Sequence, residues 1–115
     1  MKKHALLIAL PLLVLTAALA MPVHAATSSL KILKFEADWC GACQKMKPIF
    51  SSVSKSSPAG VSFQSINVDT QTALAEQYKV ELLPTVVAVK NGKVVGRSTG
   101  FMSAAKLKSF IKKHQ

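Results

Sequence analysis

The sequence predicts an α/β fold with a four-stranded mixed sheet and helices on both of its faces. Strand-like apolar runs alternate with segments of helical periodicity in the order β-α-β-α-β-β-α. A strand, a helix and a second strand in succession imply a parallel pair joined by a crossover helix. Asn91-Gly92 between two short runs predicts a tight hairpin, which adds an antiparallel edge.

The first three predicted elements are a strand over 30–35, a helix over 39–54 and a strand over 61–68. The first strand is an apolar-rich run, whereas the helix has apolar residues at i, i+3, i+4 and i+7. Pro48 lacks the N–H that a helix needs at that point, so it is expected to kink the helix. Residues 51–60, rich in Ser, Pro and Gly, contain the turn.

The remaining elements are a short helix over 72–79, strands over 86–90 and 93–98, and a last helix. Asp69-Thr70 offers a cap for the short helix, and Ser103 caps the last one. The last helix places its apolar residues on one face and most of its lysines off that face.

The N-terminus has the layout of a secretory signal peptide, in which a basic start precedes an apolar run over 5–20. We expect cleavage after Ala25, with Ala20 as a second candidate and a retained membrane anchor as the other interpretation. The apolar run is shorter than the ~20 residues of a spanning helix. Residues 1–25 are therefore predicted to be a signal peptide and 26–115 a single domain in the periplasm or secreted.

The composition is basic, with a formal net charge of +10 from 15 basic and 5 acidic residues. The lysines are scattered along the chain and form no arm, so we expect no nucleic-acid partner. They make a solvated surface or steer the domain toward acidic proteins or anionic membranes. The length allows one domain, which we expect to be a monomer.

The only two cysteines and the only tryptophan lie together in Ala37-Asp38-Trp39-Cys40-Gly41-Ala42-Cys43. Cys40 stands where a strand meets a helix, and Cys43, three residues on, shares its helix face. The free N–H groups and the dipole of a helix N-terminus stabilise a thiolate, which is the attacking species in disulfide exchange. Cys40 is therefore the predicted nucleophile and Cys43 the resolving thiol. A bridge that closes so short a loop contributes little as a structural staple.

This motif and several residues beyond it resemble the thioredoxin family. The matching residues are Phe35, Ala37 to Cys43, Pro48, Asn67-Val68-Asp69, Leu83-Pro84-Thr85, Asn91-Gly92 and Gly100. The resemblance implies a thiol–disulfide oxidoreductase with a minimal thioredoxin fold. Full-length members begin with an extra strand and helix, for which this chain has no room after the expected cleavage site.

The resemblance also implies a substrate-binding set. Pro84 would be a cis proline against the cysteines, with the backbone of Leu83 and Thr85 offered to a substrate peptide. Trp39 would shield the sulfurs and contact partners, although it could instead be an ordinary core aromatic. The set is Trp39, Gly41, Ala42, Leu83, Pro84 and Thr85.

Lys34 stands where the family commonly buries an aspartate that aids proton transfer, and Ser65 where it often has a lysine. Glu36 is two residues along the same strand and therefore shares a face with Lys34. We hypothesise that the two form a pair beneath the active site and that Glu36 relays protons to Cys43. The alternative is that Lys34 extends to solvent and Glu36 is merely exposed.

Gly41-Ala42 stands where reducing thioredoxins usually have Gly-Pro, and where oxidases and isomerases usually carry a histidine. The absence of an imidazolium favours a reducing or intermediate potential. The expected function is reduction of protein disulfides outside the cytoplasm, with electrons from a membrane donor protein and without cofactor or metal. The alternatives are an oxidase or isomerase, a copper carrier, or a non-catalytic binding module.

Overall fold

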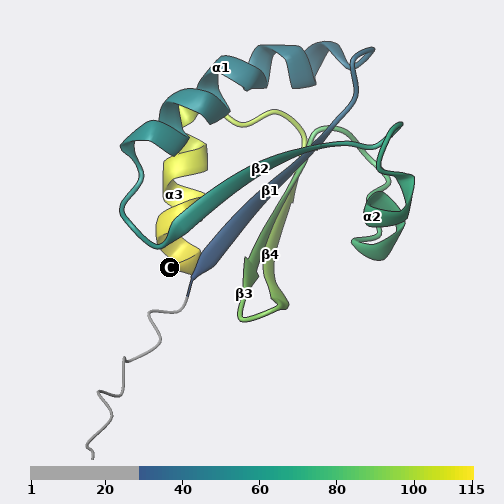
Figure 1. Ribbon diagram of the computed structural model, residues 1–115. Helices are drawn as coiled ribbons and strands as arrows, with labels where there is room; N and C mark the ends of the chain where they lie inside the picture. The colour runs from purple at the N-terminus through teal and green to yellow at the C-terminus, as the bar shows by residue number, and fades with distance from the viewer. Residues whose placement is uncertain (1–28) are drawn as a thin grey trace, which may run out of the picture.

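The computed structural model describes residues 29–115 (Figure 1), and the predicted signal peptide over 1–25 lies outside the described residues. Seven elements succeed one another in the predicted order. They are β1 (Leu30–Glu36), α1 (Gly41–Ser56), β2 (Val61–Asn67), α2 (Thr72–Gln77), β3 (Thr85–Lys90), β4 (Lys93–Thr99) and α3 (Ala104–His114). Within this part of the chain no helix is both long and apolar enough to cross a membrane.

The four strands form one mixed sheet in the order β2-β1-β3-β4. β1 pairs in parallel with β2 and antiparallel with β3, and β4 is antiparallel to β3. Phe35 near the end of β1 is in register with Ile66 of β2 and Thr85 of β3. The last residues of β1 and β2 and the first residues of β3 therefore lie at the same end of the sheet. The cysteine motif begins at this end.

Helices cover both faces of the sheet, as predicted, with α1 and α3 on one face and α2 on the other (Figure 1). The first face has the larger core, in which Met46 and Phe50 of α1 and Leu107 of α3 pack on alternate residues of the strands. The second core holds Phe35 and Ala75. Alternation along β1 thus divides its side chains between two cores.

The element boundaries differ from the prediction in two informative places. α1 begins at Gly41 rather than at Trp39, because Cys40 is its N-cap. The predicted Asp69-Thr70 cap of α2 is wrong: the N-cap is Gln71, and no side chain caps this helix. The N–H groups of Asp69 and Thr70 instead donate to Oδ1 of Asn67, at 2.9 and 3.3 Å, which closes a turn after β2.

The other end signals are confirmed. Ser103 caps α3, its Oγ accepting from the N–H of Lys106 at 3.2 Å. Asn91 and Gly92 both have positive φ, 52° and 75°, as a two-residue hairpin with a right-handed twist requires. Pro48 lies inside α1, as predicted.

Candidate active site

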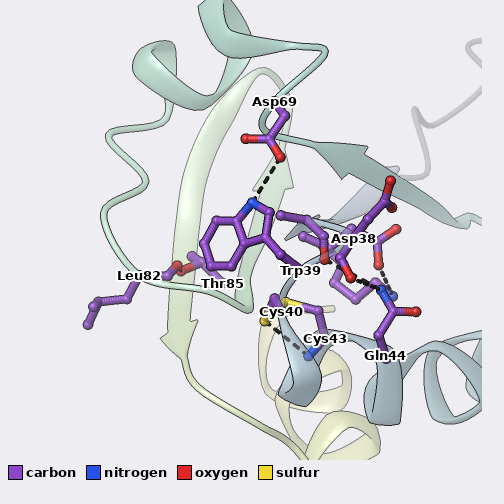
Figure 2. The surroundings of a disulfide bond; sticks show 11 residues. Asp38, Trp39, Cys40, Cys43, Gln44, Asp69, Leu82 and Thr85 are labelled. Atoms are coloured by element: carbon purple, nitrogen blue, oxygen red, sulfur yellow. Dashed lines mark hydrogen bonds and ion pairs between the residues drawn. A yellow bond between two sulfur atoms is a disulfide. The ribbon is translucent and has the colours of Figure 1, made fainter.

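Cys40 and Cys43 form a disulfide at the start of α1 (Figure 2), with their Cα atoms 5.2 Å apart. Cys40 has extended backbone geometry at the N-cap, and its Sγ accepts a hydrogen bond from the N–H of Cys43 at 3.2 Å. Cys40 is 8% exposed and Cys43 is 0% exposed. An incoming group therefore meets Cys40 before Cys43, and Cys40 is also the residue whose sulfur accepts an N–H of the helix start.

The loop that delivers Cys40 is held by Gln44, in the first turn of α1. Its Nε2 donates to the carbonyl oxygens of Asp38 at 3.2 Å and Ala37 at 3.5 Å. The N–H of Cys40 donates to Ala37 O at 3.1 Å and so closes the same turn. Gln44 was not predicted, because its spacing from the cysteines carries no recognisable signal.

Trp39 lies on the surface beside the disulfide and is 72% exposed, so the interpretation as a core aromatic is wrong. Its indole Nε1 donates to Oδ2 of Asp69 at 2.9 Å (Figure 2). Asp69 lies in the turn closed by Asn67, and the N–H of Val68 donates to Glu36 O at 2.9 Å. The end of β2 thereby fixes the orientation of the tryptophan ring.

The Leu83–Pro84 peptide bond is cis, as the resemblance implied. Leu83 packs against the cluster formed by Ala37, Cys40 and Cys43. Pro84 O accepts from the N–H of Gly100 at 2.7 Å, and the Thr85 hydroxyl donates to Leu82 O. The first bond ties the segment before β3 to the residue after β4, and the second closes a turn within the segment, next to the cysteines.

An apolar groove of about 350 Å³ runs between Trp39 and the segment before β3. It is lined by Trp39, Val68, Val80, Glu81, Leu82 and Leu83. Leu82 is 64% exposed and widens the apolar surface at its rim. Between the two cysteines, a side chain added at Gly41 would meet no neighbouring atom within 4 Å, so the surface there is open.

Lys34 and Glu36 form the expected pair, with Nζ of Lys34 3.0 Å from Oε2 of Glu36. Lys34 is 1% exposed and its Nζ lies 4.9 Å from the centre of the Phe50 ring, so it does not extend to solvent. Glu36 is 13% exposed. The angles of this contact are not those of a hydrogen bond, so the two side chains form an ion pair only. Among the described residues, none donates a hydrogen bond to Oε2 of Glu36.

The structure thus brings most of the predicted site residues to one edge of the sheet. Cys40, Cys43, Ala42 and Leu83 belong to one cluster, and Trp39 and Leu83 line the groove beside it. Residues 29–115 hold no group of three or more His, Cys, Asp or Glu side chains that could bind a metal ion.

Comparison with known proteins agrees with this geometry. The sequence profile of the thioredoxin family matches residues 16–113. A thioredoxin of Chlamydia trachomatis is 35% identical over 88 residues, which is 76% of this chain and 85% of that protein. A thioredoxin of Mycoplasma pneumoniae is 37% identical over 86 residues, covering 75% of this chain and 83% of that protein.

Solved thioredoxin structures superpose on the same part of the chain. The reduced thioredoxin pre-protein of Schistosoma mansoni is 35% identical, with a TM-score of 0.70 over 76% of this chain and 81% of that chain. A thioredoxin of Nicotiana alata is 33% identical, with a TM-score of 0.71 over 76% and 75%. This chain belongs to the thioredoxin family, as a thioredoxin-like disulfide oxidoreductase whose redox pair is Cys40 and Cys43.

Proposed function

We propose that this protein reduces disulfides of other proteins outside the cytoplasm. The observation that carries the proposal is the unequal placement of the two sulfurs. Cys40 caps α1 and is the more accessible sulfur, whereas Cys43 is sealed beneath it. One sulfur is suited to attack a partner and the other to attack only its neighbour.

The reaction consists of two exchange steps. With the pair reduced, the Cys40 thiolate attacks one sulfur of the substrate disulfide, so a mixed disulfide forms and the second substrate sulfur leaves as a thiolate that takes up a proton. Cys43 then loses its proton and attacks Sγ of Cys40. The substrate sulfur that was bonded to Cys40 leaves as a thiolate and takes up a proton. The substrate has then gained two electrons, and the Cys40–Cys43 pair, now a disulfide, has lost two.

Substrate recognition is assigned to the surface around the sulfurs. The groove beside Trp39 accepts an apolar side chain that flanks the substrate cysteine, since most of its lining is apolar. The backbone of Leu83 and Thr85 lies against the substrate chain, with Pro84 between them. The open side at Gly41 leaves room for that chain to approach Cys40.

Glu36 is proposed to move the proton of Cys43. Cys43, Met46 and Phe50 are all on the buried face of α1, and Lys34 lies against Phe50. Glu36 is two residues further along β1, toward the Cys43 end of that face. Lys34 holds this carboxylate in place with an ion pair.

A reductase in an oxidising compartment needs an outside source of electrons. The proposed source is a membrane protein that passes reducing equivalents across the bilayer to Cys40–Cys43. Export is inferred from the basic and apolar N-terminus, with cleavage after Ala25. The N-terminal sequence of the exported protein is then expected to begin at Ala26; a protein that retains Met1 would contradict cleavage.

The direct test is reduction of insulin disulfides by the purified protein with dithiothreitol as electron source. We expect Cys40→Ser to abolish the catalysed rate, and Cys43→Ser to accumulate a mixed disulfide at Cys40. Catalysis that survives in Cys40→Ser would contradict the role of Cys40. If the unmodified protein does not catalyse insulin reduction at all, the proposed enzymatic function is wrong. The fold is monitored in each variant by circular dichroism.

A further inference from the structure

The acidic side chains of this domain are confined to part of its surface and leave one end of the sheet to lysines. The acidic residues of the chain are Glu36, Asp38, Asp69, Glu76 and Glu81. Glu36 ends β1, Asp38 and Asp69 are in the loops around Trp39, and Glu81 lines the groove beside it. Glu76 is on α2, on the sheet face opposite α3. The acidic side chains thus gather at the active-site end and on the α2 face.

The other end of the sheet is built from the start of β1, the loop before β2 and the β3–β4 hairpin. The N–H of Leu30 donates to Gly60 O at 3.1 Å, and Leu30 is in register with Lys90, which pairs with Lys93. The C-terminus of α3 lies beside the start of β1 (Figure 1).

The ends of α1 and α3 complete this surface. Between them lies a cleft of about 370 Å³ whose lining includes Ser56, Pro58, Lys108 and Lys112. Lys55 is in the last turn of α1, and Lys112 and Lys113 are in the last turn of α3. Cations in these positions also face the negative ends of two helix dipoles, so the lysines are favoured there.

We define the basic end by the lysines that these elements bring together. They are Lys55, Lys90, Lys93, Lys108, Lys112 and Lys113. Five of them are exposed and Lys90 is half-buried. None of the five acidic residues of the chain lies among them. No acidic side chain compensates these lysines, although the C-terminal residue Gln115 lines the same cleft as Lys108 and Lys112.

We propose that the basic end is a docking surface for an anionic phospholipid bilayer. Each lysine near such a surface gains about 1 kcal/mol from the negative surface potential. The attachment point of the N-terminal segment gives a second reason. Residues 1–28 join the domain at Ser29, next to Leu30 in the middle of the basic end. In any molecule that retains the apolar run over 5–20, this end of the domain is therefore the one held nearest the headgroups.

Docking in this orientation turns the disulfide away from the bilayer. Cys40 and Trp39 come after the far end of β1, across the length of the sheet from the basic end. The active site then faces the aqueous phase, where a folded partner can reach it. The proposal does not depend on the direction of electron flow at Cys40–Cys43.

The test is partition of the full chain between buffer and phospholipid vesicles. We expect stronger binding to mixed phosphatidylcholine and phosphatidylglycerol vesicles than to phosphatidylcholine alone. Binding to phosphatidylcholine alone reports the contribution of the apolar N-terminus, so the preference for anionic lipid is the measured quantity. This preference should vanish in about 1 M salt, where the Debye length falls to about 3 Å.

Two triple variants with the same change in net charge separate a local surface from general basicity. Lys93→Gln, Lys112→Gln, Lys113→Gln removes half of the basic end, and we expect the anionic preference to fall roughly fivefold per lysine. The matched control is Lys45→Gln, Lys47→Gln, Lys106→Gln, in which all three lysines are exposed and outside the basic end. An equal loss in both variants, or no anionic preference in the unmodified chain, would overturn the proposal.

Two further outcomes bear on partner and orientation. Trp39 is the only tryptophan, and when the chain is bound to anionic vesicles its quenching by acrylamide should be unchanged. Protection of Trp39 would mean that the active-site end contacts lipid, against the proposal. Binding of polyglutamate that depends on the basic end, without any preference for anionic vesicles, would assign this surface to acidic proteins instead.

Discussion

The Nζ atom of Lys34 lies 3.0 Å from Oε2 of Glu36, on the sheet face that α1 covers, and solvent reaches almost none of the lysine. Both residues come from β1, two positions apart, so the pair is formed within one strand. A buried charge is tolerated only where an opposite charge or hydrogen bonds compensate it. Lys34 and Glu36 therefore depend on each other, and the segment leading to Cys40 depends on both.

The first prediction concerns the stability of this pair. Lys34→Met should lower the free energy of unfolding by roughly 3 kcal/mol, because it leaves the Glu36 carboxylate buried without its partner. Adding Glu36→Gln removes that charge, so the double variant should regain a large part of the loss. Urea denaturation of the oxidised protein measures both. If the losses of unfolding free energy caused by Lys34→Met and by Glu36→Gln simply add in the double variant, the two charges are not coupled in the folded state.

The second prediction concerns proton transfer. Glu36→Gln should slow the release of the mixed disulfide between Cys40 and substrate by roughly a hundredfold, the usual size of a lost general base. Stopped-flow measurement of the second exchange step isolates this effect, while attack by Cys40 should be nearly unchanged. Glu76→Gln is the control, since Glu76 is an exposed carboxylate on α2, outside the groove. A resolving rate in Glu36→Gln equal to that of the control would rule out the relay.

The third prediction concerns the hydrogen bond between Trp39 and Asp69. Asp69→Ala frees the indole N–H, and the lost bond, worth about 1 kcal/mol, should lower kcat/KM for insulin roughly fivefold. Reduction of the disulfide by dithiothreitol should change little, since this small reagent does not need the groove. The fluorescence anisotropy of Trp39 should fall as the ring gains freedom. Asp38→Ala serves as the control, because the carboxylate of Asp38 does not bond to the indole; an equal effect there would refute the role of the bond.

The features that the sequence predicted best depend on residues that lie close together in the chain. The position of Cys40 at the start of a helix results from the local pattern, and the Lys34–Glu36 contact results from the period of a strand. The Trp39–Asp69 bond joins residues 30 positions apart, so it depends on how the ends of β1 and β2 align. No local pattern encodes that alignment.

The incorrect cap of α2 has a related cause. Asp69 and Thr70 have the residue types of an N-cap, but Asn67 accepts the N–H groups of both and closes a turn before the helix begins. Asn, Asp and Thr compete for the same local backbone groups, and composition alone does not decide between them. Gln44 was missed for a simpler reason, since its amide contacts backbone atoms that any sequence would offer.

The fourth prediction concerns Ala42, between the cysteines, and the reduction potential of the Cys40–Cys43 pair. Ala42 is half-buried on the first turn of α1 and packs beside Cys40 and Cys43. Equilibration with glutathione should place the unmodified pair nearer to about −270 mV than to about −120 mV, because Gly41 and Ala42, and no histidine, separate the two cysteines. Ala42→His supplies that cation and should make the pair more oxidising by at least about 30 mV, a tenfold change in the equilibrium constant. Ala42→Ser, which adds a polar group without charge, should move it far less. A value for the unmodified pair near about −120 mV would reverse the proposed direction and make the protein an oxidase, while leaving the roles of Cys40 and Cys43 intact.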